Sequence, residues 1–137
     1  MNIYVANDHA GYELKKNIIP ILKHYGHVID LGADSAESSD YPLYAQKLAT
    51  HMDASSKGVL ICGSGVGMCI AANRFSHIRA AVCHSKEETR LARQHDDINV
   101  LCLAGRLDDS FIEMIDMFFK TPFFKDERYK RRIDFMS

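Results

Sequence analysis

Short apolar runs alternate with segments of helical spacing along most of the chain. The runs are rich in Val, Ile and Leu and nearly continuous in apolar character, which is typical of strands that are covered on both faces. They lie at residues 2–6, 27–31, 58–62, 78–83 and 99–104. Between them, apolar residues recur at helical spacing, as in residues 12–25, 44–52 and 70–75. This alternation predicts an α/β fold, a Rossmann-like three-layer α/β/α sandwich around a five-stranded parallel sheet.

Three further features concern the helices. Pro20 falls inside the first helical segment, where a proline removes a hydrogen bond and costs about 3 kcal/mol, so a kink or break is expected near Ile19. Residues 108–120 predict a helix with Asp108 or Asp109 as N-cap. Its expected apolar face consists of Phe111, Ile112, Ile115, Phe118 and Phe119. Residues 125–132 carry five basic and two acidic side chains, which by themselves indicate a solvated face of a C-terminal helix.

The overall composition is that of one globular domain, residues 1–137. Apolar residues make up 47% of the chain and charged residues 26%, and the net charge of −1 gives no reason to expect nucleic acid or a membrane surface as a partner. No apolar run approaches the length of a membrane span and the N-terminus does not resemble a signal peptide, so a cytoplasmic location is expected. The four cysteines form no CxxC pair, which predicts free thiols and no metal site.

In a parallel α/β sheet, ligands bind outside the carboxyl ends of the strands. The segments that follow the expected strands hold polar and glycine residues, beginning with Asp8 and His9. These two residues are a candidate acid/base pair; the alternative is that Asp8 only stabilises a turn. The glycine-rich loop 63–67 leads into a helix, so its free backbone N–H groups can hold an anion.

Cys62 stands directly before this loop, where a thiolate is favoured, so it is a candidate base or nucleophile. A Cys-x5-Arg phosphatase would need arginine at the position of Met68, which argues against that class. His95, expected in a loop beside Asp96 and Asp97, is a candidate proton donor or acceptor at neutral pH.

Several motifs occur together in this chain: NDHAGYELK (7–15), DYP (40–42), ICGSGVGMCIAANR (61–74), IRAAVC (78–83), RQHDDINVL (93–101) and GR (105–106). In order and spacing they closely resemble the family of ribose-5-phosphate isomerase B and the galactose-6-phosphate isomerase subunits. The resemblance runs from about residue 3 to residue 132.

The resemblance implies an aldose–ketose isomerase of the pentose phosphate pathway that acts on a small phosphosugar through a cis-enediolate, without metal or other cofactor. In that family Cys62 would be the base that moves the proton between C2 and C1, Ser64 would shuttle protons between the sugar oxygens, and His95 would open the furanose ring. The loop backbone at Gly63, Gly65, Val66 and Gly67 would stabilise the enediolate. Contacts to the sugar or phosphate would come from Asp8, His9, Tyr41 and Asp96.

The resemblance also reverses the interpretation of the basic tail. Arg106, Arg128 and Arg132 match the family's phosphate-binding arginines, and the last two would share one helix face because they are four residues apart. Family sites are built across a homodimer, or a dimer of dimers, so the tail would serve the neighbouring subunit.

Two departures from the family leave the substrate open. Asp96 stands where the family has an amide, and a carboxylate can accept but not donate a hydrogen bond. Tyr129 stands where histidine is frequent. The leading hypothesis is isomerisation of ribose 5-phosphate and ribulose 5-phosphate. The alternatives are a hexose 6-phosphate isomerase, such as one for allose or galactose 6-phosphate, a non-catalytic phosphosugar-binding protein, and a phosphocysteine carrier, which the arginines and His95 disfavour.

Overall fold

A five-stranded parallel sheet forms the centre of the structure, a computed structural model that describes residues 1–137. The strand order is β2-β1-β3-β5-β4, and every neighbouring pair is parallel. The strands are β1 (Asn2–Asn7), β2 (His27–Asp30), β3 (Lys57–Cys62), β4 (Ala80–Val82) and β5 (Val100–Ala104). All five expected strands are therefore present, and the predicted parallel sheet is confirmed.

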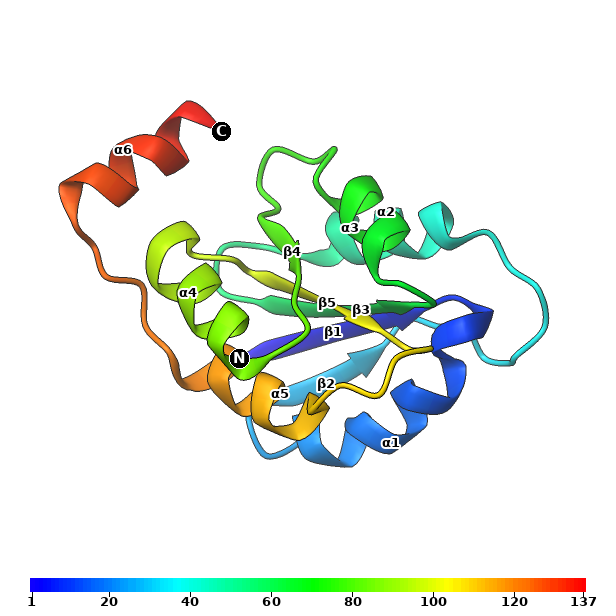
Figure 1. The fold of residues 1–137 in the computed structure, drawn as a ribbon. Coiled ribbons are helices and arrows are strands. Elements are labelled where there is room, and N and C mark those ends of the chain that lie inside the picture. The colour runs from blue at the N-terminus through cyan, green and yellow to red at the C-terminus, as the bar shows by residue number, and fades with distance from the viewer.

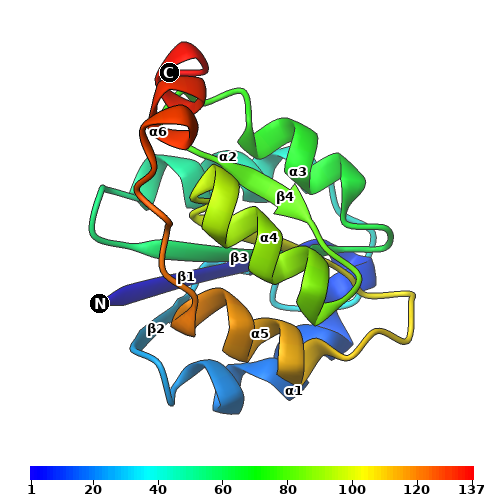
Figure 2. The same cartoon turned by 60° about the vertical axis from the view of Figure 1, so that its left-hand side comes forward.

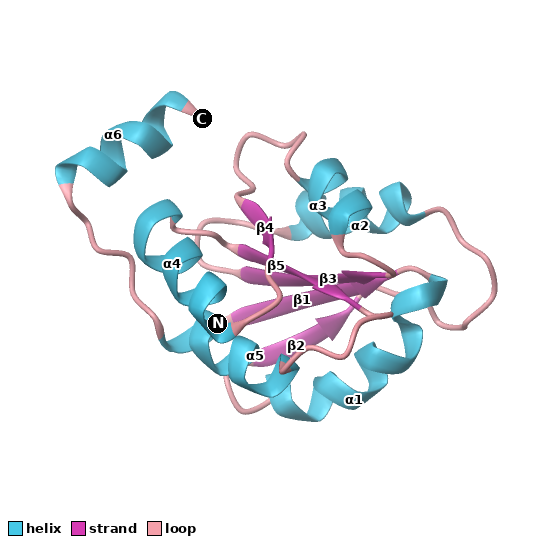
Figure 3. Ribbon diagram, in the orientation of Figure 1, coloured by secondary structure: helices cyan, strands magenta, loops and turns pink.

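Helices cover both faces of the sheet, as Figures 1, 2 and 3 show from two directions. They are the short 3-10 helix η1 (His9–Gly11), α1 (Tyr12–Leu22), α2 (Tyr41–His51), α3 (Val66–Ala72), α4 (Lys86–Asp96), α5 (Phe111–Lys120) and α6 (Glu127–Phe135). The buried side chains form two apolar clusters, one where α2 and α3 pack on the sheet and one where α1 and α5 pack on it. The three-layer architecture is thus confirmed. No helix is long and apolar enough to cross a membrane.

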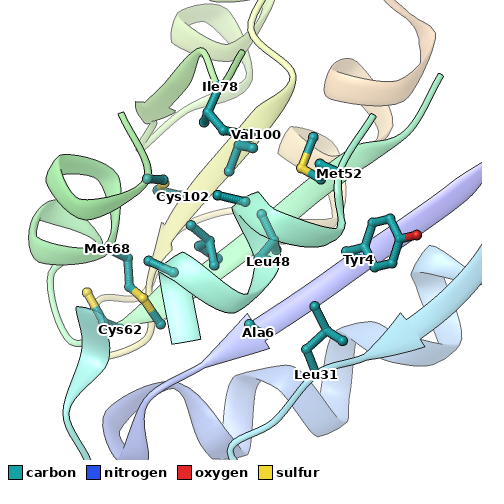
Figure 4. Close-up of a cluster of buried hydrophobic side chains, with 14 residues drawn as sticks. Tyr4, Ala6, Leu31, Leu48, Met52, Cys62, Met68, Ile78, Val100 and Cys102 are labelled. Carbon is teal, nitrogen blue, oxygen red and sulfur yellow. The ribbon is translucent and has the colours of Figure 1, made fainter. Parts of the chain in front are cut away.

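The alternation of side chains along β3 decides which cluster each residue joins. Val59 and Ile61 belong to the cluster under α1 and α5, whereas Leu60 and Cys62 belong to the cluster under α2 and α3. Figure 4 shows this second cluster, with Cys62 at one end beside Met68. The last residue of β3 is therefore placed on the same face as the glycine loop and α3.

The expected break near Ile19 and the expected N-cap of the helix over residues 108–120 were wrong. Helix α1 continues through Pro20 to Leu22, because Ile18 and Leu22 are buried against the sheet while Pro20 itself is exposed near the end of the helix. Helix α5 has Ser110 as its N-cap residue rather than Asp108 or Asp109.

The expected apolar face of α5 is only partly confirmed. Ile115 and Phe118 are fully buried, but Ile112 is 65% exposed, and Met114 occupies the core in its place.

Helix α6 makes few contacts with the rest of the molecule. Figures 1 and 2 show it beyond the amino ends of the strands, connected by an extended segment and lying beside α4. None of its residues is buried. The helix therefore exposes almost its whole surface in the single chain.

A buried lysine ties α1 to the carboxyl end of β2. The Lys15 side chain is 3% exposed, and its ammonium donates hydrogen bonds to Asp30 Oδ1 at 3.2 Å and to the Ala33 carbonyl at 2.5 Å. Asp30 Oδ1 also accepts from the Gly32 N–H at 2.9 Å. This network holds the start of the loop that leads from β2 to α2.

Replacing Lys15 with methionine should lower the free energy of unfolding by about 2 kcal/mol, because it leaves a buried carbonyl without a donor and a carboxylate without its cation. Asp30 is 37% exposed, so water offsets part of the loss. Urea denaturation measures the change. Lys16→Met is the matched control, since Lys16 pairs with Glu13 in an exposed position and should change stability little. Equal effects of the two substitutions would contradict this interpretation.

Candidate active site

Cys62 lies where three strands end together. It is 4% exposed at the carboxyl end of β3. The Asp8 N–H donates to the Ile61 carbonyl at 3.1 Å, and the Gly105 N–H donates to the Cys62 carbonyl at 2.7 Å. The segments after β1 and β5 are thereby held against the end of β3, at the point where the order of strands reverses. This is the edge at which an α/β sheet binds its ligands.

The loop after Cys62 presents backbone donors. Gly65 has a φ of +79°, a left-handed conformation that favours glycine. The N–H groups of Gly63, Ser64 and Gly67 donate to no acceptor within the chain. The Val66 N–H is engaged by the Ser64 hydroxyl oxygen at 3.2 Å, which leaves the hydroxyl proton of Ser64 free to donate. The loop therefore offers several free donors beside the thiol of Cys62.

Asp8 and His9 have distinct local roles. Asp8 Oδ1 accepts from the Ala10 N–H at 2.9 Å and the Gly11 N–H at 3.1 Å, so this oxygen caps η1, as the turn interpretation expects. His9 exchanges hydrogen bonds with Ser39: the Ser39 N–H donates to His9 Nδ1 at 3.2 Å, and the His9 N–H donates to the Ser39 hydroxyl at 3.0 Å. A ring whose Nδ1 accepts carries its proton on Nε2, so neutral His9 can donate to a ligand.

Tyr41 and Arg106 flank the loop. A Cβ atom at Gly67 would lie 2.6 Å from Tyr41 Cζ, and one at Gly63 would lie 3.2 Å from Arg106 Nη1, so both side chains rest directly on glycine backbone. The Arg106 guanidinium makes no ion pair or hydrogen bond within the chain. It is a free cation beside Cys62, suited to an anionic group.

His95 lies at the other end of the sheet. It belongs to the last turn of α4 rather than to the loop expected from the sequence, and α4 leads into the amino end of β5. Strand β5 advances about 3.3 Å per residue, so its two ends, Val100 and Ala104, are about 13 Å apart. Because Cys62 pairs with Ala104, His95 cannot reach the thiol of its own chain.

The other residues expected to contact the phosphosugar lie at this same far end. Asp96 is the exposed last residue of α4, and Arg128 and Arg132 lie on α6. The ring of Tyr129 stacks on that of His95 with centroids 4.7 Å apart, and both arginines lie within about 6 Å of the Tyr129 centroid. One chain therefore carries two groups of candidate site residues, at opposite ends of the sheet.

Two features of the structure were not predicted from the sequence. Ser39, which holds His9, stands in a polar run with several serines, and nothing in the pattern distinguishes it. Cys69 is half-buried on α3, where a hydrogen bond from the Cys102 thiol lowers its pKa to about 7 against the opposing effect of burial. Its sulfur also contacts the Ala80 carbonyl at 3.4 Å, near the amino end of β4 and away from Cys62.

The largest cavity does not include Cys62. It lies at the amino ends of the strands, lined in part by Lys57, Arg79 and Asn99. No three His, Cys, Asp or Glu side chains lie close enough together to hold a metal ion. None of the cavities of the single chain is lined by Cys62.

The chain is similar to known proteins over its whole length. The ribose/galactose isomerase family model matches residues 3–136. A probable ribose-5-phosphate isomerase B of Mycoplasma genitalium is 43% identical, with 97% of this chain and 91% of that protein covered. The ribose-5-phosphate isomerase B of Mycobacterium leprae is 40% identical, with coverages of 100% and 88%.

Solved structures show the same similarity. Ribose 5-phosphate isomerase B of Anaplasma phagocytophilum superimposes with a TM-score of 0.94 at 38% identity, covering 99% of this chain and 96% of that one. The Mycoplasma genitalium ribose-5-phosphate isomerase B with bound ribulose-5-phosphate gives a TM-score of 0.88 at 43% identity, with coverages of 98% and 93%.

Proposed function

The chain belongs to the ribose/galactose isomerase family and is an aldose–ketose isomerase; we propose that it interconverts D-ribose 5-phosphate and D-ribulose 5-phosphate through a cis-enediolate. The observation that carries this proposal is the arrangement of a nearly buried thiol, Cys62, beside free backbone donors and the unpaired cation Arg106. Such a site suits a substrate with an acidic carbon at one end and a phosphate at the other.

In the proposed reaction, the Cys62 thiolate removes the proton from C2 of the open-chain aldose. The electron pair moves into the C1–C2 bond, and the carbonyl oxygen becomes the enediolate oxygen. Free N–H groups of Gly63, Ser64 and Gly67 stabilise this charge, each donor contributing a few kcal/mol. The hydroxyl of Ser64 moves a proton between the two sugar oxygens, and Cys62 returns its proton to C1 to give the ketose.

We further propose that each site is completed by a second copy of the chain in a homodimer. Ring opening needs His95, and phosphate binding needs Arg128 and Arg132, but all three lie at the end of the sheet opposite Cys62. A two-fold arrangement can bring the amino end of one sheet to the carboxyl end of the other, because the same two surfaces then meet twice. The exposed α6 is the element that would reach across.

Phosphate binding in this arrangement combines residues of both subunits. Arg106 and His9 come from the chain that supplies Cys62, and the two arginines of α6 come from its partner. Arginine forms paired, charge-assisted hydrogen bonds with a phosphate dianion, which makes this set suited to a terminal phosphate. Tyr129 holds His95 by ring stacking, so its departure from the family residue is compatible with a positioned histidine.

The substrate is tested by steady-state kinetics on ribose 5-phosphate, allose 6-phosphate and galactose 6-phosphate. We expect a kcat/KM for ribose 5-phosphate at least tenfold above that for either hexose phosphate, because phosphate and thiol sites at a set separation fit one chain length and misplace the longer one. A higher kcat/KM for a hexose phosphate would mean that this hexose phosphate, and not ribose 5-phosphate, is the preferred substrate. No turnover of any of the three would contradict the proposed function.

A further inference from the structure

The loop between β5 and α5 carries both a cation for the substrate and two carboxylates. Arg106 lies across Gly63 with no partner in the chain, while Asp108 and Asp109 follow two and three residues later. Three residues of chain span at most about 10 Å, so both carboxylates are within reach of a long arginine side chain. A pairing of Arg106 with either carboxylate would compete with a phosphate for the same guanidinium.

A histidine that follows the neighbouring strand is hydrogen-bonded to one of these carboxylates. His84 follows β4, which pairs with β5, and its Nδ1 lies 2.9 Å from Asp109 Oδ2. The Asp109 side chain is 15% exposed, against 41% for His84, so the carboxylate is the more enclosed partner. The backbone N–H of Phe111 donates to the Asp109 carbonyl at 2.9 Å, which fixes the residue at the start of α5.

These contacts turn the Asp109 carboxylate toward β4. Backbone bonds from the Arg106 N–H to the Gly63 carbonyl (3.1 Å) and from the Leu107 N–H to the Ala104 carbonyl (3.1 Å) hold the first part of the loop at the glycine loop. Arg106 and Asp109 are thus held by different neighbours, the guanidinium at the site and the carboxylate at His84. Asp108 is exposed and forms no ion pair, so its carboxylate is solvated by water.

We propose that His84 is a positioning residue that holds Asp109 and thereby keeps Arg106 free to bind the phosphate of the substrate. The inference rests on the proposed function, in which Arg106 is a phosphate ligand. Without His84, Asp109 gains a nearby cation as its best remaining partner. An Arg106–Asp109 pair would then have to break before phosphate binds, and the negative charge of the Asp109 carboxylate would repel the phosphate.

The test is a set of variants assayed with ribose 5-phosphate: His84→Ala, His84→Gln, Asp109→Ala and the double variant His84→Ala/Asp109→Ala. His84→Ala should raise KM about three- to fivefold, the strength of an exposed ion pair, and leave kcat nearly unchanged because phosphate binding is remote from the reacting carbons. His84→Gln keeps a donor for Asp109 and should stay near the wild-type KM. The double variant should return KM to within about twofold of wild type, because the competing carboxylate is gone.

Rescue in the double variant is the decisive result, since a merely structural contact would leave it at least as impaired as His84→Ala. The proposal is overturned if the double variant keeps the raised KM, or if His84→Ala leaves KM unchanged. It is also overturned if His84→Ala raises KM further in an Arg106→Ala background, where no guanidinium remains to be protected. Thermal unfolding of each variant establishes that it is folded.

The inference and the proposed function fail in different ways. If the wild type does not turn over ribose 5-phosphate, the proposed function fails, and calorimetric titration with inorganic phosphate replaces KM as the readout across the same variants. A weaker phosphate affinity in His84→Ala that Asp109→Ala restores supports the inference there as well. Unchanged phosphate affinity in His84→Ala overturns it.

Discussion

Replacing Cys62 with alanine should lower kcat for ribose 5-phosphate isomerisation by at least about 10³-fold, because the substitution removes the proposed base for proton transfer between C2 and C1. The side chain is nearly buried at the end of an apolar cluster, so alanine leaves only a small cavity and the chain should still fold. KM should change little, since the thiol contributes to the transition state rather than to phosphate binding. Steady-state kinetics with purified variant, together with its thermal unfolding curve, measures both effects.

Cys69→Ala is the matched control for this experiment. Cys69 is the cysteine with the lowered pKa, about 7, yet it lies on α3 toward the amino end of β4 and not beside the glycine loop. Its replacement should leave kcat within about twofold of wild type, as expected for a substitution away from the reacting atoms. If instead Cys69→Ala abolishes turnover and Cys62→Ala does not, the base has been assigned to the wrong thiol.

Two inactive variants should restore activity to each other when they share a dimer. Cys62→Ala lacks the proposed base, and His95→Ala lacks the group proposed to open the ring, which should lower activity about 10²-fold or more. In a mixed dimer of these two chains, one site receives both substitutions and the other receives neither. The purified mixed dimer should therefore have about half the wild-type activity, given two equivalent sites related by a two-fold axis. Co-expression with two different affinity tags yields this species for kinetic assay.

The control is a mixed dimer of wild-type chain with the double variant Cys62→Ala/His95→Ala. If sites are shared, each site of this dimer carries one substitution and the dimer is nearly inactive. If each chain forms its own site, the two mixed dimers exchange behaviour: this one is half active and the first is inactive. The second pattern would refute the shared site and would require α4 and α6 to rearrange within one chain.

Much of the fold follows from hydrophobic periodicity. The exact ends of a strand, however, depend on hydrogen bonds from side chains. Residues 78–83 have the composition of a strand, but β4 spans only Ala80–Val82. The Ala80 N–H bonds to the side chain of Asn73 and the Arg79 N–H to that of Asn99, so amide side chains occupy backbone groups at the start of the strand. Periodicity carries no information about such contacts.

The separation of the candidate site residues into two groups, one at each end of the sheet, follows from their order in the sequence. Residues that follow a strand, such as Cys62 and Arg106, lie at the carboxyl edge, whereas His95 precedes a strand and must lie at the amino edge. The place of α6 could not be derived in this way. It has no buried residue, so no apolar face indicates what it packs against. The extended segment before it does not fix the direction in which the helix runs.

The exposure of α6 has a thermodynamic consequence for the proposed dimer. If Arg128 and Arg132 of one chain bind the phosphate held by another, then substrate bridges two chains and favours their association by the same factor by which association favours substrate binding. Dilution of the protein would then favour dissociation of both substrate and subunits, and a high concentration of sugar phosphate would favour the dimer. A helix with few contacts inside its own chain would thus couple the concentration of a metabolite to the quaternary state of the protein.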